Sequence, residues 1–542
     1  MRKMMVRVVA LGLGCVSSGA IARQQAAPPP PTPAPEQAPP AVAPPVVAQM
    51  PAPASKGKPP SHYLRCDGLP DNMSVGESAA RLISLSLVVG LLAPPHESAD
   101  ISKRYVGAEG VAACDAALAG ESDEVRRAQL ILARAIHHIE AKEYDAAIAD
   151  TREVHAMNGP VASSIGFRQS LALSALELEA AALLRQRKPD KAEQTAIAMA
   201  EESPWDLDNF VHALRYVGVS PALPPEKRAF VDKYARLRPD GITVRAAARR
   251  WNGDFAGAAD DLQTLRALLD SIRSEEKGPI KLPALTSGIA VDYALAGQMD
   301  KARALGAEAR KDVEELAAGP EAMSRNTEIS QAAEALDFLG VIEKLANGQL
   351  DAARAAFAAR SRWLQPGAAA VATLSERLRA GAKPDQLTGA LATEPEAIRK
   401  TFFDVRYAAM TEGKNAAGLL WGAIRNPISG GAYSGLARNT WRIEKSKYLT
   451  AAKSGNLRGW EGIVVTNGDG VPAGEALLLH AALIAKARGK TGFVIAPVRQ
   501  RIDVAFVKFA NAGDSGFPAD LLVDAQAVTD GLAPVIPQPV TK

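Results

Sequence analysis

The clearest hydrophobic pattern of the chain lies between Arg127 and Pro160, where apolar residues recur three or four positions apart. That spacing places them on one face of a helix, and it predicts two helical runs separated by a short turn at residues 141–145. A Gly-Pro pair at 159–160 ends the second run. Because small residues occupy both runs, Ala135 in the first and Ala147 in the second, the pattern predicts two antiparallel helices in close contact.

Four weaker segments repeat this order of a helical run, a polar turn and a second helical run with an alanine near its start. These alanines are separated by 45, 66, 44 and 51 residues, and the longest gap has room for an extra helix pair. Hairpins of this kind bury their apolar faces against their neighbours, so the pattern predicts a stack of five. The alanines, in chain order, are Ala147, Ala192, Ala258, Ala302 and Ala353.

The first hairpin resembles the tetratricopeptide repeat (TPR), whose signature combines a small and an aromatic residue, a Gly-x-Tyr-x-x-Ala turn and a late proline. Tyr144 and Ala147 match the turn, Pro160 matches the proline, and the fifth hairpin ends at Pro366 in the same way. The resemblance covers residues 107–425 and implies a mainly α fold, a TPR-like α-solenoid of helical hairpins. A standard repeat has about 34 residues, so helices or loops are lengthened here.

In that family the first helices of the hairpins line a concave face that holds a partner segment and performs no chemistry. Repeats that clamp a C-terminal carboxylate carry paired Lys and Asn residues, which this chain lacks on the corresponding positions. The resemblance therefore implies an apolar or amphipathic segment of another envelope protein as the partner. The alternative is that the same residues only pack the core. The candidates are Gln129, Leu132, Ile136, Glu177, Thr243, Arg250, Trp251, Ser287, Phe338 and Ile342.

The texture of the sequence changes after Arg425, where Asn426–Gly431 breaks the helical pattern. Short β-rich runs follow at residues 462–466, 492–498 and 501–510, with an apolar helical run at 473–489 between the first two. We predict that residues 426–542 form a small C-terminal α/β domain. We expect it to seal the open end of the helical stack.

The N-terminus has the features of an export signal. Arg2, Lys3 and Arg7 precede a short apolar core, and Ala20-Ile21-Ala22 matches a small-x-small cleavage pattern. Residues 1–22 are therefore predicted to be a signal peptide of a periplasmic protein. The alternative is a membrane-anchored lipoprotein, because Gly12-Leu13-Gly14-Cys15 looks like a lipobox that departs from the usual pattern only at Gly12. Residues 23–61 form a Pro/Ala-rich linker whose composition predicts disorder.

Removal of the signal peptide changes both the charge and the cysteine count. The chain has 63 basic and 60 acidic residues, and the loss of three basic residues leaves a balanced mature chain. Balanced charge gives no general attraction for nucleic acid, and we predict none as a partner. The apolar run at 80–92, behind a capping box at Ser74–Glu77, is too short to span a bilayer, so no transmembrane span is predicted.

Cys66 and Cys114 would be the two cysteines left, and in an exported chain they most simply form one disulfide. They belong to a predicted N-terminal helical segment at residues 62–120, ahead of repeats at 121–425. The order Ala113-Cys114-Asp115 before the first hairpin also resembles exported proteobacterial TPR proteins, and this resemblance supports the pairing. A redox pair or metal site is the alternative, but the CxxC spacing is missing.

Three motifs imitate catalytic or ligand sites. Asn467–Ala473 imitates a dinucleotide loop, but Asp469 and Glu475 would oppose a pyrophosphate. Gly513–Gly516 imitates the nucleophile loop of chymotrypsin-like proteases, yet no positioned base accompanies Ser515, and the only nearby histidine, His480, is in a helical run. The histidines at 137, 138 and 155, with Glu140, lack the spacing of a metal site.

These observations predict a non-catalytic protein–protein interaction scaffold at the cell envelope, with neither a cofactor nor a metal. The alternative function is a small-ligand-binding or hydrolytic C-terminal α/β domain whose substrate the repeats recruit.

Overall fold

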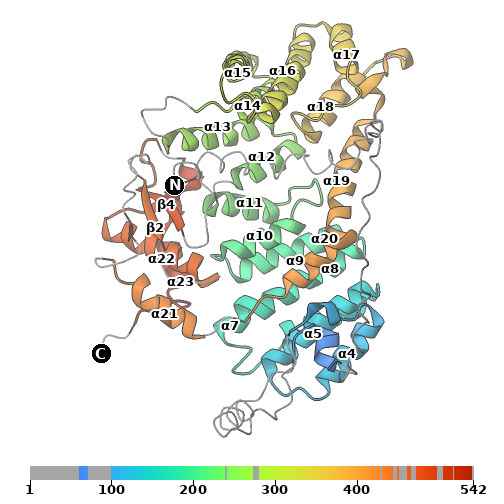
Figure 1. Cartoon of the computed structure of the whole chain (residues 1–542). Helices are drawn as coiled ribbons and strands as arrows, with labels where there is room; N and C mark the ends of the chain where they lie inside the picture. The colour runs from blue at the N-terminus through green and yellow to red at the C-terminus, as the bar shows by residue number, and fades with distance from the viewer. Residues whose placement is uncertain are drawn as a thin grey trace, which may run out of the picture.

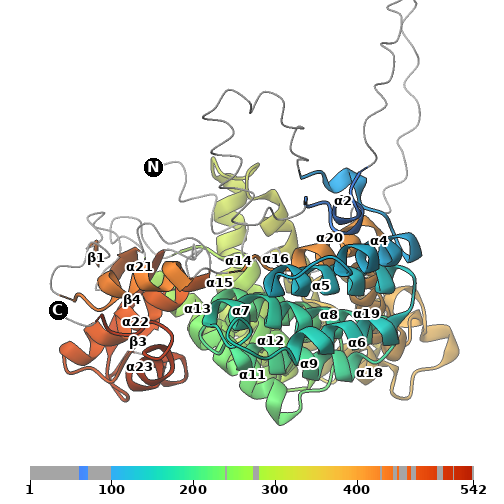
Figure 2. The same cartoon turned by 90° about the horizontal axis from the view of Figure 1, so that it is seen from below.

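The computed structural model describes residues 60–70, 99–238, 241–272, 280–427, 430–443, 449–450, 460–464, 471–496, 504–516 and 518–539. The predicted signal peptide, Cys15, nearly all of the proline-rich linker and the predicted helix at 80–92 lie outside the described residues and stay predictions. The described chain is mainly helical, with a small antiparallel sheet near its C-terminus (Figures 1 and 2). Within these ranges, no helix is both long and apolar enough to cross a membrane.

The five predicted hairpins are present as five pairs of consecutive helices that pack against each other. Each first helix also packs on a neighbouring hairpin or on an intervening helix, so the pairs form one continuous row (Figure 1). The pairs are α5 (Glu124–Glu140) with α6 (Tyr144–His155), α8 (Leu173–Arg185) with α9 (Pro189–Glu202), α12 (Ile242–Trp251) with α13 (Phe255–Ser271), α14 (Pro283–Leu295) with α15 (Met299–Ala318), and α16 (Asn326–Ala346) with α17 (Leu350–Ala358).

The turns of all five hairpins have the same backbone geometry. One turn residue adopts a left-handed conformation, with φ between 60° and 80°, and the next amide donates to the carbonyl five residues earlier at 2.8–3.0 Å. This is the Schellman arrangement, which satisfies carbonyls left free at a helix end. The left-handed residues are Lys142, Arg187, Gly253, Gly297 and Gly348.

The alanine of each second helix occupies an equivalent position in all five hairpins. Its amide donates to the carbonyl of the residue just before the helix, at 2.9–3.1 Å, so it lies in the first turn of that helix. All five alanines have no exposed surface. The register that the sequence predicts from Ala147, Ala192, Ala258, Ala302 and Ala353 is therefore confirmed.

Short elements precede and interrupt the row. α2 (His62–Cys66), the 3-10 turn η2 (Ile101–Lys103) and α4 (Ala108–Leu118) come before the first hairpin. α7 (Ile165–Phe167) and the π-helical turn η3 (Arg168–Ala172) lead into α8. The longest gap between hairpins holds α10 (Leu207–Tyr216) and α11 (Pro225–Leu237), which are the extra helix pair that the spacing predicts.

After the fifth hairpin the chain turns back along the row. This return segment consists of α18 (Ala368–Arg379), α19 (Pro395–Thr411) and α20 (Gly413–Ala423), with the 3-10 turns η6 (Pro384–Gln386) and η7 (Gly389–Ala392) between the first two. α18 contacts α12 and α14, α19 contacts α8, and α20 contacts α8 and α5. In Figure 1 the return segment runs from the yellow end of the row toward the blue end.

The C-terminal unit combines helices with an antiparallel sheet of strand order β1-β2-β4-β3-β5. Three of its strands and α22 coincide with predicted elements, whereas β1 and β5 have two residues each and carry no sequence pattern. Its elements are α21 (Gly430–Thr440), β1 (Leu449–Thr450), β2 (Glu461–Val464), α22 (Val471–Ala487), β3 (Gly492–Ile495), β4 (Val504–Ala510), η8 (Ala519–Leu521), β5 (Val523–Asp524) and α23 (Ala525–Leu532).

The C-terminal unit lies beside the middle of the row. α22 contacts α10, and both β3 and η8 contact α11, so the unit rests on the extra helix pair (Figures 1 and 2). Residues of the unit belong to both hydrophobic cores: Leu477 packs with the first half of the row, and Val494 packs with the second half. This position corrects the prediction that the unit seals an open end of the stack.

Candidate functional site

The ten residues predicted to line a concave face fall into two groups. Four are half-buried, namely Gln129, Thr243, Arg250 and Trp251. Six are buried and are closed to a partner in this conformation, namely Leu132, Ile136, Glu177, Ser287, Phe338 and Ile342. Their role in binding stays a prediction, but those six pack the interior as they stand.

Helix α14 shows why the first helices are so deeply buried. Eleven of its thirteen residues are buried, because α13, α15, α16 and α18 all pack against it. Phe338 on α16 is equally enclosed, in an aromatic cluster with Phe357 and Trp363 at ring separations of 6.1 and 5.2 Å respectively. A hydrophobic pattern identifies the helix but does not indicate how many neighbours surround it.

The return segment covers the ends of the first helices where they approach their turns. Trp251, the last residue of α12, packs against Phe402 and Phe403 of α19 with both ring centroids 5.0 Å away. Arg187, in the turn after α8, lies over the ring of Tyr407 at 4.0 Å. The half-buried candidate Trp251 therefore already has a partner, which is part of the same chain.

Two arginines tie α19 to the row through backbone carbonyls. Arg406 donates from Nη2 to the carbonyls of Leu214 and Val217, at 3.2 and 3.1 Å, where α10 ends. Arg185 of α8 donates in the other direction, to the carbonyl of Met410 at 3.1 Å. Carbonyls at helix ends lack intrahelical partners, so these bonds satisfy groups that would otherwise need water. Burial lowers the pKa of both guanidinium groups.

Helix α20 is anchored more firmly than α19. Ala416, Leu420 and Ala423 are buried, and Trp421 meets the ring of His137 on α5 edge-on at 5.3 Å. The guanidinium of Arg104 lies over the Trp421 ring, 4.0 Å from its centroid. The return segment is therefore fixed at the first hairpin by the contact of the half-buried Trp421 with the buried ring of His137.

The charged candidate Arg250 also has an internal partner. Its Nη2 lies 2.6 Å from Oδ2 of Asp292, a completely buried residue of α14. Burial raises the pKa of Asp292, and Arg250 opposes that rise. The ion pair joins the third hairpin to the fourth, so the charge of Arg250 is paired within the chain.

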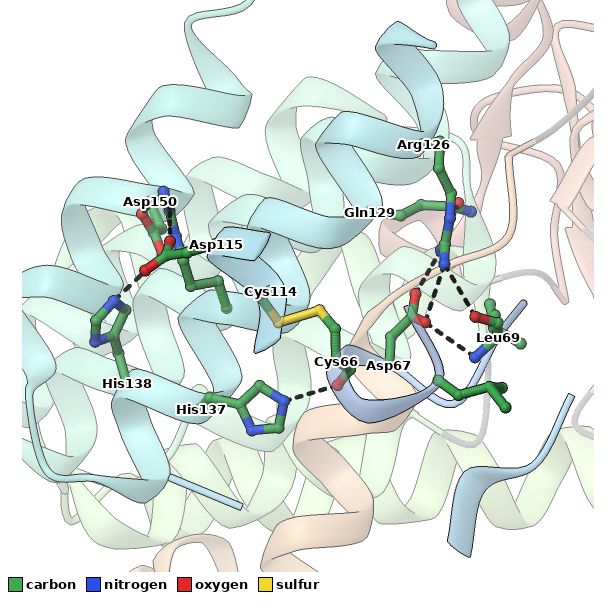
Figure 3. The surroundings of a disulfide bond; sticks show 12 residues. Cys66, Asp67, Leu69, Cys114, Asp115, Arg126, Gln129, His137, His138 and Asp150 are labelled. Atoms are coloured by element: carbon green, nitrogen blue, oxygen red, sulfur yellow. Dashed lines mark hydrogen bonds and ion pairs between the residues drawn. A yellow bond between two sulfur atoms is a disulfide. The ribbon is translucent and has the colours of Figure 1, made fainter. Parts of the chain in front are cut away.

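His137 and the disulfide form a structural cluster at the start of the row (Figure 3). Cys66 and Cys114 are bonded, which confirms the predicted pairing. His137 is buried, and its Nε2 lies 2.7 Å from the carbonyl oxygen of Cys66. Asp67 receives two hydrogen bonds from the buried guanidinium of Arg126. Within the described ranges, no group of three or more His, Cys, Asp or Glu side chains could hold a metal ion.

Ser515, in the segment that imitates a protease nucleophile loop, is exposed in the turn that follows β4. His480 is buried in α22, and its Nδ1 lies 2.7 Å from the carbonyl oxygen of Thr440. Burial lowers the pKa of His480, with the Thr440 contact opposing. The glycine-rich loop at 467–470 lies outside the described residues.

A second candidate site is a cluster of buried polar side chains where the row meets the C-terminal unit. Glu177 has no exposed surface, and its two oxygens lie 2.6 Å from His212 Nδ1 and 2.8 Å from Arg215 Nη1. Arg425, just after α20, lies 3.7 Å from Glu177 and donates to Asn209 Oδ1 at 2.9 Å. The carboxylate of Glu177 therefore has His212, Arg215 and Arg425 around it.

The cluster also contains two carboxyl groups with raised pKa values, those of Asp206 and Glu475. Asp206, at the start of α10, is 1% exposed, and burial raises its pKa to about 6 against the opposing effect of Arg425. Glu475 of α22 is also 1% exposed; burial and the nearby Asp206 raise its pKa to about 8. Gln169, on the π-helical turn η3, donates to Glu475 Oε1 at 2.8 Å. Glu475 is therefore mainly protonated at neutral pH.

Several polar atoms of this cluster have no hydrogen-bond partner among the described residues. They are Asp206 Oδ2, Glu475 Oε2, Gln169 Oε1, the Tyr433 hydroxyl, and Nε and Nη1 of Arg425. Burial raises the pKa of Tyr433, and the nearby carboxyl groups of Glu475 and Asp206 raise it further. A buried polar group without a partner costs about 1–3 kcal/mol. Several such groups in one cluster therefore indicate a site where a bound molecule would make polar contacts.

The sequence analysis missed this cluster, although one signal for it was present. Glu475 and His480 are polar exceptions in a helix, α22, that is otherwise apolar up to Lys486 in its last turn. Asp206, Gln169 and Arg425 stand in unremarkable local patterns, and the fold alone brings them together. Comparison with family models, curated proteins and solved structures finds no match to the chain.

Proposed function

We propose that the chain is a non-catalytic interaction scaffold of TPR type at the cell envelope, with a TPR-like α-solenoid at its centre. The observation that carries the proposal is the equivalence of the five hairpins, which share one turn geometry and one buried alanine. Repeated hairpins build extended surfaces suited to holding another protein. The disulfide between Cys66 and Cys114 supports an oxidising compartment such as the periplasm.

The partner face in this proposal is the edge of the row at Trp251 and the turns beside it. Crosslinking and pull-down from envelope fractions with the full mature chain tests it. We expect specific capture that Trp251→Ala weakens at least tenfold. Arg152→Ala is the matched control, because Arg152 is exposed on α6, on the opposite helix layer, and pairs there with Glu179. Equal capture by all three proteins would exclude this face, and no specific capture would contradict the scaffold.

A second candidate function is the binding of a small polar ligand at the cluster around Asp206 and Glu475. The unpartnered atoms of this cluster include both donors and acceptors, and they come from the row and the C-terminal unit alike. Its ligand would therefore both donate and accept hydrogen bonds, as amino acids and monosaccharides do. Ligands of the native state raise its stability, by about 2.7 kcal/mol at a hundred times Kd. Thermal unfolding of the full chain with such compounds, compared with Glu475→Gln, tests the idea; identical curves throughout would refute it.

A further inference from the structure

Helix α19 packs on the surface of the row and is less deeply buried than the helices of the hairpins. No residue of α19 is buried as a whole, although the guanidinium of Arg406 is enclosed, whereas ten of the seventeen residues of α5 are buried. Its contribution to the two hydrophobic cores is confined to partly buried side chains such as Tyr407, Met410 and Ile398. α19 therefore supplies none of the buried residues of either core.

The contacts of α19 with the row lie on a single stripe. Phe402, Phe403, Arg406, Tyr407 and Met410 are spaced so that they share one face of the helix, and these residues make the contacts described above. The opposite face carries exposed charges, including the ion pair of Lys400 with Asp404. α19 is thus an amphipathic helix lying in a site formed by other elements.

The connections of α19 allow it to move as a unit. Only Glu412 separates it from the anchored α20, whose first residue, Gly413, has a φ of 76° and no atom within 4 Å of a Cβ placed there. At the other end, residues 380–394 contain only 3-10 turns. Side chains near that end form ion pairs whose acidic partners are exposed, such as Arg399 with Glu376.

We propose that α19 is a displaceable occupant of the partner face, and that the partner is an amphipathic helix of the same chemistry. This inference rests on the proposed scaffold function. The external helix would present two adjacent aromatic residues to Trp251, followed one turn later by an arginine and an aromatic residue. The arginine would bond to the carbonyls of Leu214 and Val217, and the second aromatic ring would receive Arg187. The chain's own α19 keeps the face covered until that helix replaces it.

The probe for a direct test is a fluorescent peptide of residues 395–411. We expect it to bind the full-length variant Phe402→Ala/Phe403→Ala at least tenfold more tightly than the wild type, because the weakened α19 competes less well. Adding Trp251→Ala to that variant should abolish the gain, whereas Arg152→Ala should leave it intact. A scrambled peptide controls for nonspecific binding, and circular dichroism confirms that each variant is folded.

Hydrogen exchange on the wild type gives an independent readout. Amides of α19 should exchange at least tenfold faster than those of α5, and the free peptide should not protect α5. Equal protection of the two helices, or equal peptide binding by the wild type and the α19 variant, would overturn the proposal. A concentration-dependent dimer that Trp251→Ala abolishes would assign the face to a second copy and overturn it as well.

The two proposals fail separately in these experiments. Peptide exchange with no captured envelope partner would contradict the scaffold function while the displaceable helix stands. Capture that depends on Trp251 combined with a fully protected α19 would support the scaffold and refute displacement.

Discussion

Glu475 places a carboxyl group on an apolar helix of the C-terminal unit, where it is buried against Gln169 of the row. The protonation of this carboxyl group is therefore coupled to folding. Its folded pKa of about 8 lies above the ordinary value of 4.5, chiefly because burial disfavours the charged form and Asp206 repels it. A raised pKa means that the folded state binds the proton more tightly. The Glu475 contribution to stability is therefore complete below pH 4.5 and is lost as the pH rises through 8.

We predict that Glu475→Gln flattens the pH dependence of stability. Between pH 4.5 and 8 the free energy of unfolding of the wild type should fall more than that of the variant, by an amount on the order of 3 kcal/mol. Urea unfolding at several pH values measures the difference. Glu109→Gln, at an exposed position on α4, is the control and should follow the wild type. A variant curve parallel to that of the wild type would show that Glu475 does not ionise in this range.

The turns of the hairpins are the first feature at the scale of elements. Lys142 and Arg187 adopt the left-handed conformation that three glycines adopt at the equivalent positions. A side chain in this conformation costs about 1 kcal/mol, because its Cβ crowds the backbone. The fold therefore imposes the shared turn even where the local residue disfavours it.

We predict that Lys142→Gly stabilises the protein by about 0.5–1 kcal/mol and that Gly253→Ala destabilises it by about 1 kcal/mol. No atom lies within 4 Å of a Cβ at Gly253, so the second effect is purely conformational. Urea unfolding of both variants measures the two changes. Changes of the same sign would show that these turns are not equivalent.

The buried alanines fix the distance between the helices of each pair. Ala302 has no exposed surface, whereas Ala304, two residues further on along α15, is exposed. We predict that Ala302→Leu destabilises the protein by about 1–3 kcal/mol or more, because added methylenes force packed helices apart. Ala304→Leu should change stability by less than about 0.5 kcal/mol. Thermal unfolding compares them, and similar losses would mean that the hairpins are not closely packed there.

At the scale of the whole molecule, the local patterns were predictable and the long-range course of the chain was not. The hairpins, the extra helix pair and the Cys66–Cys114 bond follow from spacing and composition, because turns, alanines and cysteines are local or few. The sequence pattern of α19 is that of an ordinary amphipathic helix. Such a pattern does not indicate that α18–α20 turn back across the row. The cluster of Asp206, Arg425 and Glu475 depends on three segments meeting, which a pattern within one segment does not reveal.

The position of the C-terminal unit determines how the molecule should unfold. Leu477 and Val494 pack in different halves of the row, and Arg245 on α12 pairs with Asp520 at 2.6 Å. Within the unit, Trp441 Nε1 donates to the carbonyl of Ile536 at 2.8 Å. Part of the unit's apolar surface is therefore covered by the row.

We predict that an isolated fragment of residues 426–542 is unfolded, and that the full chain loses the unit and the adjacent α10–α11 pair together. Without the row, the fragment would expose the apolar residues that the two cores now bury, and a chain of this size has little surplus stability with which to tolerate that exposure. Circular dichroism and the dispersion of amide resonances of the fragment measure its folding, with the full chain as reference. Removal of residues 426–542 should conversely lower the protection of α10 and α11 amides before that of α14. A fragment with native dispersion would show that the unit is an independent domain, and the shared cores would then be a contact between two separately stable parts.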